Sequence, residues 1–341
     1  MKELRVAILG YGGIARAHMH GYDQLEKEGL PIRRVALCDI DPKQFSTIQE
    51  INIKGEGEQT TGALHLYTDA DEMLAKEEID IVDICLPTYL HKEYTIRMLR
   101  AGKHVQCEKP MALSASDCAE MIAVAKENGV QLMIGQCLRF NANYLALKEV
   151  LESGQYGRVT AAHFERLSAL PRWGFDGWFR DVTRSGGALM DMGIHDADMI
   201  RFLWGDPDSV SGVTYHRDMQ NQGAACRLLY QNGMTVTFNT SWCEAAGFPF
   251  TSTFRVTMEK ATVAWDGRGQ VKVYPAEGEA YELTYAQTDH MAEESRYFAE
   301  TVSGKHENTK NPPESAMASL SLIEKLYESA AHDGQTIVIK E

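Results

Sequence analysis

Positive charge and long apolar runs are both scarce in this sequence. Lysine and arginine total 34 against 48 aspartates and glutamates, a formal net charge of −14. A nucleic-acid groove needs a basic stripe and an anionic membrane attracts clustered lysines, so we expect neither partner. No apolar run approaches the ~20 residues of a membrane-spanning helix. Met1-Lys2-Glu3 leads into a strand pattern instead of a secretory segment, so we expect a cytoplasmic location.

Cysteine is also scarce, and its spacing excludes the common disulfide and zinc frameworks. The seven cysteines are odd in number and none stand in C-x-x-C spacing, which is typical of reduced thiols. With 44% hydrophobic and 24% charged residues, the composition is that of an ordinary globular protein. A chain of 341 residues exceeds the usual single core, so we expect two domains, 1–125 and 126–341.

A glycine-rich turn follows the first apolar segment, Leu4–Leu9, and precedes a helical pattern over 15–28. In such a strand–turn–helix, the first glycine permits the tight turn and the second lets the backbone approach a pyrophosphate. A small residue, here Ala15, lets the helix pack close to the strand, and the helix N-terminus directs N–H groups at the phosphates. The pattern predicts a dinucleotide site at Gly10, Gly12, Gly13 and Ile14.

A carboxylate, Asp39, follows the second apolar strand, expected over 32–37. At this distance from the glycines it can accept hydrogen bonds from the adenosine ribose hydroxyls. It would repel a 2′-phosphate, so we expect NAD as cofactor, with NADP less favoured. In an alternative interpretation Asp39 only begins a loop, in which Asp41-Pro42 caps the next helix.

The order of strand and helix patterns predicts the fold class. Strands alternate with helices as far as Gln131–Gly135, which predicts a doubly wound parallel sheet, with a loop over 52–62. Beyond a helix at 141–152, short alternating segments predict an open, mostly antiparallel sheet in an α+β domain. Those segments are 159–164, 210–215, 225–230, 235–240, 253–258 and 262–265. We expect one helix over 187–204, and late helices over 290–302 and 313–331 that pack back on the first domain.

The tripeptide Glu108-Lys109-Pro110 stands where a parallel strand ends, which is the edge where open α/β sheets bind ligands. Lys109 there would place a cation near a nicotinamide. A solvated surface lysine beside Glu108 is an equal alternative.

Asp191, His195 and Asp198 fall at i, i+4 and i+7 of the expected helix and would share one face. A histidine flanked by carboxylates is suited to proton transfer near neutral pH. A surface Asp–His pair is the plainer alternative. A metal site is a third, but the H-x-x-D spacing matches no zinc pattern, so we expect no metal.

Aromatic residues gather in the loop from Leu170 to Thr183, just ahead of that helix. Trp173 and Trp178 could stack on a sugar ring while Arg180 meets its hydroxyls; alternatively, the tryptophans fill the domain interface. We expect Trp242 and Trp265 to be core or subunit-contact residues. His18 and His20 are expected to be packing or surface residues.

Taken together, these stretches resemble the glucose–fructose oxidoreductase, inositol dehydrogenase and rhizopine-catabolism family (Gfo/Idh/MocA). The resemblance covers nearly the whole chain. It rests on the glycine turn G-x-G-G-I-A, Leu86-Pro87-Thr88 with His91, Glu108-Lys109-Pro110, Arg139-Phe140, and Gly186-Gly187 ahead of Asp191-x-Gly193-x-His195. In one departure, Thr88 stands where many members have asparagine.

The resemblance implies NAD(P)-dependent hydride transfer at a sugar or cyclic polyol carbon, with an inositol-like substrate among the candidates. Lys109 would hydrogen-bond the reacting oxygen, His195 would be the acid/base, and Asp191 would bind substrate or orient the histidine. Arg139 would reach the substrate. The residues implied at the cofactor are Leu86, Pro87, Glu108 and His91, the last either touching the ribose or capping a helix.

An open sheet usually finds a partner, so we expect a homodimer or homotetramer formed through it. Two other functions fit the same scaffold. One is an NAD-dependent glycosidase that oxidises its substrate transiently, and the other is a nucleotide-sensing regulator without turnover.

Overall fold

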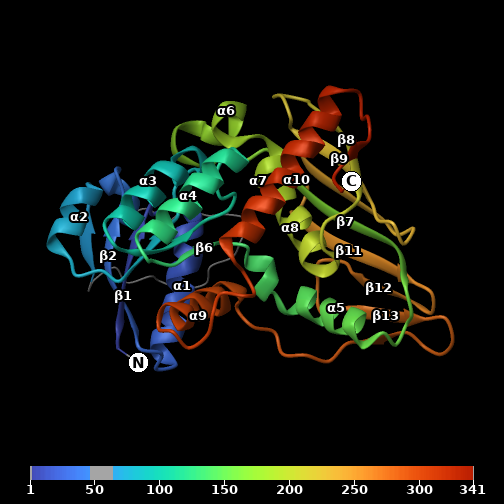
Figure 1. The fold of residues 1–341 in the computed structure, drawn as a ribbon, viewed down its shortest axis with the longest axis horizontal. Coiled ribbons are helices and arrows are strands. Elements are labelled where there is room, and N and C mark those ends of the chain that lie inside the picture. Colours follow the sequence, from blue (N-terminus) through green and yellow to red (C-terminus); the bar gives the residue numbers. More distant parts are fainter. Residues whose placement is uncertain (1, 47–63, 341) are drawn as a thin grey trace. The chain divides into compact units, whose positions relative to one another are not determined.

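The computed structural model describes residues 2–46 and 64–340, so the loop expected at 52–62 lies outside the described residues. The chain forms two compact units, each assembled from separate stretches (Figure 1). The first comprises Met1–Cys137, Trp173–Trp178 and Asp289–Met317, and the second comprises Leu138–Arg172, Phe179–Thr288 and Ala318–Glu341. Within the described parts of the chain, no helix combines the length and apolar character needed to cross a membrane.

The first unit contains a six-stranded sheet in which every pair is parallel, in the order β3-β2-β1-β4-β5-β6. Its strands are β1 Leu4–Leu9, β2 Ile32–Cys38, β3 His65–Tyr67, β4 Ile81–Ile84, β5 His104–Cys107 and β6 Leu132–Ile134. The doubly wound parallel sheet is confirmed. The strand order reverses between β1 and β4, and this switch point is where such sheets bind their ligands.

Because β6 belongs to the first sheet, the first unit runs past the boundary that we expect at residue 125 and reaches Cys137. Side chains cap two of its helices: Asp69 accepts the N–H of Glu72, and Ser114 accepts that of Asp117. The helices of this unit are α1 Gly13–Lys27, η1 Pro42–Ser46, α2 Ala70–Lys76, α3 Thr88–Arg100, α4 Ala115–Glu127 and α9 His290–Val302.

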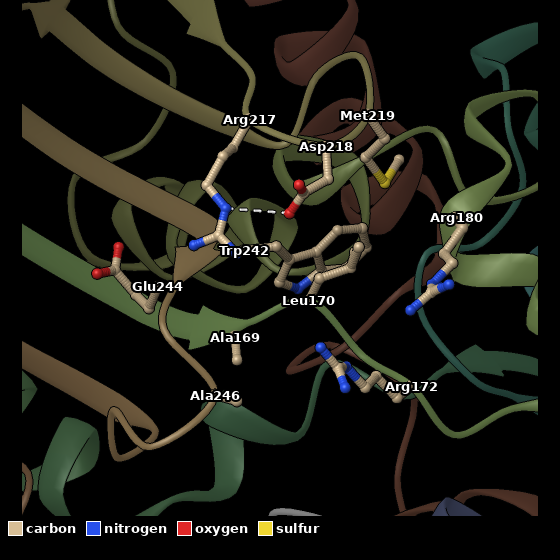
Figure 2. Close-up of a pocket in the computed structure, with 10 residues that line it drawn as sticks. All are labelled: Ala169, Leu170, Arg172, Arg180, Arg217, Asp218, Met219, Trp242, Glu244 and Ala246. Carbon is tan, nitrogen blue, oxygen red and sulfur yellow. Dashed lines mark hydrogen bonds and ion pairs between the residues drawn. The ribbon is translucent and has the colours of Figure 1, made fainter.

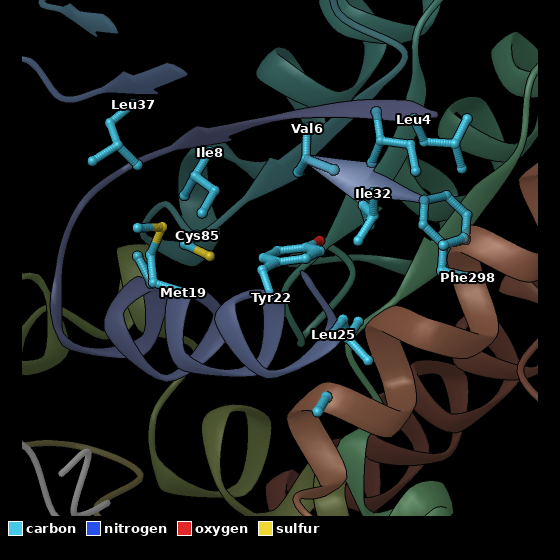
Figure 3. Packing of buried hydrophobic residues seen from close by; sticks show 14 of the residues in the cluster. Leu4, Val6, Ile8, Met19, Tyr22, Leu25, Ile32, Leu37, Cys85 and Phe298 are labelled. Atoms are coloured by element: carbon cyan, nitrogen blue, oxygen red, sulfur yellow. The ribbon is translucent and has the colours of Figure 1, made fainter. Parts of the chain in front are cut away.

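The core of the first unit lies between β1 and α1, and α9 completes it (Figure 3). Met19, Tyr22 and Leu25 of α1 are buried in the same cluster as Val6 and Ile8 of β1. Phe298 of α9 belongs to that cluster too, although it is far away in the sequence. The two helices touch through their backbones, since a Cβ on Gly21 would lie 2.9 Å from the amide nitrogen of Ala292. The predicted packing of the helix at 290–302 on the first domain is therefore present.

The second unit is built on a nine-stranded sheet in the order β14-β13-β12-β11-β7-β10-β9-β8-β15. Only β7 and β10 pair in parallel among these strands, so the predicted mostly antiparallel sheet is confirmed. The strands are β7 Val159–Ala169, β8 Ser209–Tyr215, β9 Gly223–Leu229, β10 Thr235–Glu244, β11 Thr251–Met258, β12 Ala261–Trp265, β13 Lys272–Pro275, β14 Tyr281–Glu282 and β15 Ile337–Val338.

The remaining helices are η2 Cys137–Phe140, α5 Ala142–Ser153, η3 Phe175–Arg180, α6 Val182–Ser185, α7 Ala188–Asp191, α8 Gly193–Trp204 and α10 Pro313–Ala331. Helices α7 and α8 pack on the large sheet, against β10 (Figure 1). Two expectations are corrected here. The single helix expected over 187–204 is interrupted at Met192, which separates α7 from α8.

The second correction concerns the late helix at 313–331, which we expect to pack on the first domain. Only its start, Pro313–Met317, belongs to the first unit. From Ala318 onward it belongs to the second unit, because its polar side chains bond there. The Tyr327 hydroxyl donates to the carbonyl of Gly186, and the Ser329 hydroxyl accepts the N–H of Gly212.

Candidate active site

The glycine turn lies between β1 and α1, at the switch point of the parallel sheet. Gly10 has φ +89°, and a Cβ there would lie 2.8 Å from the carbonyl oxygen of Cys85, so only glycine fits without strain. Gly12 caps α1 without any side-chain hydrogen bond, and α1 begins at Gly13. Ile14 packs on the core of the unit, and Ala15 is fully buried. The turn therefore has the glycine-lined, open helix start that a pyrophosphate requires.

Asp39 ties the end of β2 to this turn. Its Oδ2 accepts the N–H of Tyr11 at 2.7 Å, and its Oδ1 accepts the N–H of Asp41 at 2.9 Å. Burial raises the pKa of this half-buried carboxyl, and the two backbone N–H groups oppose that shift. Each carboxylate oxygen keeps a second lone pair, so hydroxyls can still bind there. In the alternative interpretation, Asp41-Pro42 caps the next helix. Asp41 does accept the N–H of Lys43 at the start of η1.

His91 connects the loop after β4 to the loop after β5. Its Nδ1 lies 2.7 Å from the carbonyl oxygen of Pro110, and its Nε2 lies 2.8 Å from that of Leu86. The ring is buried, and burial lowers the pKa of His91. In this structure the ring holds the two loops together, and its contact with a ribose stays a prediction. Leu86 and Pro87 are half-buried in the loop that it holds.

A buried charge cluster, which sequence reasoning missed, lies beneath the tripeptide 108–110. His18 of α1 contacts Asp83 of β4 through Nδ1 (2.7 Å) and Glu108 through Nε2 (3.0 Å). All three side chains are buried. Burial disfavours a charged His18, but Asp83 outweighs it, so the pKa of His18 is raised well above its usual value. The contact with His18 holds the pKa of Glu108 below its usual value, against the effect of burial.

The cluster fixes the residues around Lys109. Glu108 Oε2 accepts the N–H of Lys109 at 3.2 Å. Gly135 leaves the room for this carboxylate, because a Cβ there would lie 2.7 Å from Glu108 Oε1. Glu108 is therefore a buried support of the tripeptide, and its contact with the cofactor stays a prediction. Lys109 itself is half-buried at the carboxyl end of β5.

His18 and Asp83, with Cys85, place one potential ligand atom each within 4.8 Å of one another. Both imidazole nitrogens already face carboxylate oxygens, so this set suits a hydrogen-bonded cluster better than a metal ion. Two features of the sequence could have predicted this cluster. His18 falls on the buried stripe of α1 beside Ala15 and Met19, and Asp83 interrupts an apolar strand.

In the second unit, Asp191 and His195 stand on either side of the break between α7 and α8. Asp191 ends α7 and is 9% exposed, whereas His195 is half-buried in the first turn of α8. The N–H of His195 donates to the carbonyl of Met192 at 3.2 Å and closes the turn at the break.

The carboxylate expected on the other flank of His195 is engaged elsewhere. Asp198 accepts from Nε and Nη2 of Arg139, at 2.8 and 2.6 Å, and from the Ser319 hydroxyl. Arg139 is 2% exposed, and its guanidinium also lies over the ring of Phe202. Arg139 is therefore half of a buried ion pair, and its contact with the substrate stays a prediction. Asp196 is likewise paired, with Arg166.

The aromatic loop is divided between the units. Trp178 is buried and Trp173 half-buried, and both belong to the first unit. Arg180 belongs to the second unit, where it lines a cavity of about 370 Å³ (Figure 2). Trp242, expected in the core or a subunit contact, is buried and lines the same cavity.

Comparison with known proteins identifies the family. Residues 4–136 match the Gfo/Idh/MocA oxidoreductase family, NAD-binding Rossmann fold, and residues 144–264 match a Gfo/Idh/MocA C-terminal domain. The chain belongs to this family. The chain is 30% identical over 222 residues to 1,5-anhydro-D-fructose reductase of Ensifer adhaerens, covering 62% of this chain and 66% of that protein. It is 29% identical over 204 residues to myo-inositol 2-dehydrogenase of Thermotoga maritima, covering 60% and 55%.

Among solved structures, aldose–aldose oxidoreductase of Caulobacter crescentus has a TM-score of 0.83 at 25% identity. That match covers 99% of this chain and all of the other. The matched stretch of this Gfo/Idh/MocA protein spans between about half and two thirds of the two curated relatives. The cofactor of the family's Rossmann unit, NAD, fits the residues present. Gly10 admits no side chain, a Cβ on Gly12 would meet only open space, and Asp39 offers a carboxylate beside the turn.

Proposed function

We propose that this protein is an NAD-dependent dehydrogenase that moves a hydride between a secondary hydroxyl carbon of a sugar or cyclic polyol and nicotinamide. The observation that carries the proposal is the position of Lys109. It stands at the carboxyl end of β5 in the NAD-binding unit, in a tripeptide that His18 contacts through Glu108 and His91 contacts through Pro110. The names of the two curated relatives, a sugar reductase and an inositol dehydrogenase, support this substrate class.

Oxidising a secondary alcohol removes a proton from the oxygen and a hydride from the carbon, and NAD, when bound, supplies the hydride acceptor. Lys109 donates a hydrogen bond to the reacting oxygen and stabilises the negative charge that develops there. His195 takes the proton as general base and returns it in the reverse reaction. Asp191 either binds a substrate hydroxyl or orients His195.

Lys109 and His195 are tested by separating binding from turnover. We expect His195→Asn and Lys109→Met to lower turnover by about 100-fold or more. The affinity for NAD, measured by calorimetry, should stay unchanged in the His195 variant. His332→Asn, at an exposed histidine after α10, is the matched control and should keep full activity. Wild-type activity in His195→Asn would remove that residue from the mechanism.

The reaction class is tested by NADH absorbance with a panel of inositols, aldoses and polyols, with NADP in parallel. Turnover confined to one stereochemical group under NAD supports the proposal. NAD binding without NADH formation on any member contradicts it, and a glycoside panel then distinguishes transient oxidation from a nucleotide sensor.

We also propose that the large sheet forms a homodimer or homotetramer interface. Its strands carry exposed apolar side chains, among them Val213 and Tyr215 of β8 and Tyr274 of β13. Exposed apolar surface of this kind is typical of a face covered in an assembly. Sedimentation analysis tests this, and a monomer at micromolar concentration would contradict it.

A further inference from the structure

The cavity of the second unit is lined by an unusual share of charged side chains. It lies beside the ends of β7 and β10, and about 370 Å³ suits a molecule of monosaccharide size. Three arginines and two carboxylates line it: Arg172, Arg180, Arg217, Asp218 and Glu244. In a chain with a net charge of −14, this lining carries a formal charge of +1.

The charges are not distributed evenly around the cavity. Arg217 donates through Nε to Asp218 at 3.0 Å and through Nη1 to the carbonyl of Cys243, so protein groups already satisfy it. Glu244 accepts the Ser241 hydroxyl at 2.9 Å. Figure 2 shows these three side chains on one side of the cavity, and Arg172 and Arg180 on the other.

Arg172 and Arg180 differ from Arg217 in having no internal counter-ion. Neither makes a hydrogen bond or an ion pair with any residue in the ranges 2–46 and 64–340. Two guanidinium groups on one side of a cavity, with the two lining carboxylates on the other side, make a site for an anion. Because the chain as a whole carries a net charge of −14, the attraction for an anion in this cavity comes from these arginines.

One wall of the cavity packs on the segment that carries Asp191. Its wall is Trp242, which is 1% exposed and lies edge-on to Phe179 at 5.8 Å between ring centroids. Trp242 packs in one cluster with Ala188 and Met192. These are the first residue of α7 and the residue at the break, so the wall of the cavity rests on the segment that holds Asp191.

We propose that the substrate is a sugar acid, whose carboxylate binds Arg172 and Arg180 while its hydroxyls donate to Asp218 and Glu244. This rests on the proposed dehydrogenase function and narrows its substrate class. A phosphate ester would also bind guanidinium groups. The lining charge of +1 matches a monoanionic carboxylate better than a dianionic phosphate.

Binding is measured first, by calorimetry without cofactor, so that the result does not depend on turnover. The probes are D-glucuronate and D-gluconate, with glucose and glucuronamide as neutral partners and glucose 6-phosphate as the phosphate. We expect at least one acid to bind about 10-fold or more tightly than its neutral partner, since hydrogen bonds to a charged group are the strong ones. Equal affinity for acids and neutral partners, or no binding of either, overturns the proposal. Tighter binding of the phosphate than of both acids overturns the carboxylate assignment.

The variants Arg172→Gln and Arg180→Gln should each weaken acid binding by about 10-fold or more. Both should leave the affinity for neutral sugars and the thermal unfolding midpoint unchanged, because both side chains are exposed. Arg227→Gln is the matched control: it removes the same charge from an exposed position on β9 outside the cavity lining. An equal loss in the control would assign the effect to overall charge and overturn the proposal.

The two proposals fail separately. Acid binding that depends on Arg172 and Arg180, without NADH formation, leaves this site standing and contradicts the dehydrogenase. NADH formation from neutral polyols, with acids neither bound nor oxidised, supports the dehydrogenase and overturns the sugar-acid site.

Discussion

His18 Nδ1 lies 2.7 Å from Asp83 Oδ2, so a side chain of α1 is joined to the interior of β4 by a buried charged contact. The other ring nitrogen reaches Glu108, and one imidazole thus faces two carboxylates. The cluster also acts electrostatically on Tyr22 of α1, on Cys85 just after β4 and on His290 of α9. The arrangement connects the nucleotide-binding helix to the support of Lys109.

Removing His18 should destabilise the protein by about 3–5 kcal/mol, the usual result when one partner of a buried ion pair is lost. His18→Gln leaves two buried carboxylates without their cation. Urea unfolding measures the effect. His20→Gln is the control, because His20 stands on the same helix and is exposed. A change below about 1 kcal/mol in His18→Gln would show that His18 is not charged in the folded protein.

The pH dependence has a definite sign. The folded pKa of His18 is raised above its unfolded value of about 6.5, so its contribution is fully present below that pH. The contribution is lost as pH rises through the folded pKa. Wild-type unfolding free energy should therefore fall on the alkaline side, and that fall should be smaller in His18→Gln. Parallel pH profiles for the two proteins would contradict this.

Arg139 and Asp198 make a second buried pair, and their variants separate structure from substrate binding. Asp198→Asn should lower the unfolding free energy by about 3–5 kcal/mol, since it leaves Arg139 buried without its carboxylate. Replacing both, as Arg139→Met with Asp198→Leu, should recover much of that loss. Chemical denaturation of both variants checks this. An Arg139→Met protein that folds normally and shows only a raised KM would assign Arg139 to substrate binding instead.

The two glycines of the turn should behave differently. Gly10→Ala should destabilise the fold, because its φ is positive and a Cβ would meet Cys85. Gly12→Ala should leave stability unchanged, since its φ is −80° and nothing lies within 4 Å of a Cβ, but should weaken NAD binding. Thermal unfolding and calorimetry with NAD distinguish these effects. Unchanged NAD affinity in Gly12→Ala would place the phosphates elsewhere.

Asp39→Ala should weaken NAD by about 10-fold or more, because it removes the carboxylate proposed for the ribose hydroxyls. NADP should lose less, since its 2′-phosphate is repelled by the native side chain. Parallel titrations with the two nucleotides test this. An unchanged dissociation constant for NAD would contradict the ribose assignment.

The fold could be predicted from patterns among residues that are close together in the sequence. Apolar strands, glycine turns and the alternation of strand with helix patterns are short-range signals, and they predicted the parallel sheet correctly. The side-chain pairing was not predictable in the same way. Asp198 has the helical spacing of a partner for His195, yet it pairs with Arg139, which is 59 residues away in the sequence. Spacing on one helix cannot reveal which of several carboxylates a distant arginine will take.

In the candidate site, too, some features could be predicted from the sequence and others could not. The Gly10 turn and the position of Lys109 follow from where strands end, which a sequence shows. The role of His91 depends on two carbonyl oxygens from separate loops, and the cavity that Arg172 lines is formed where the ends of β7 and β10 meet. Neither fact is encoded in local order.

The discontinuity of the first unit has a consequence for synthesis of the chain. Its core cluster includes Ala292, Phe298 and Ala299, which the ribosome adds after nearly all of the second unit. The nascent glycine turn and β1 therefore emerge long before the helix that seals them. Until α9 arrives, Tyr22 and Leu25 lack part of their apolar cover, so this unit completes its core late in translation.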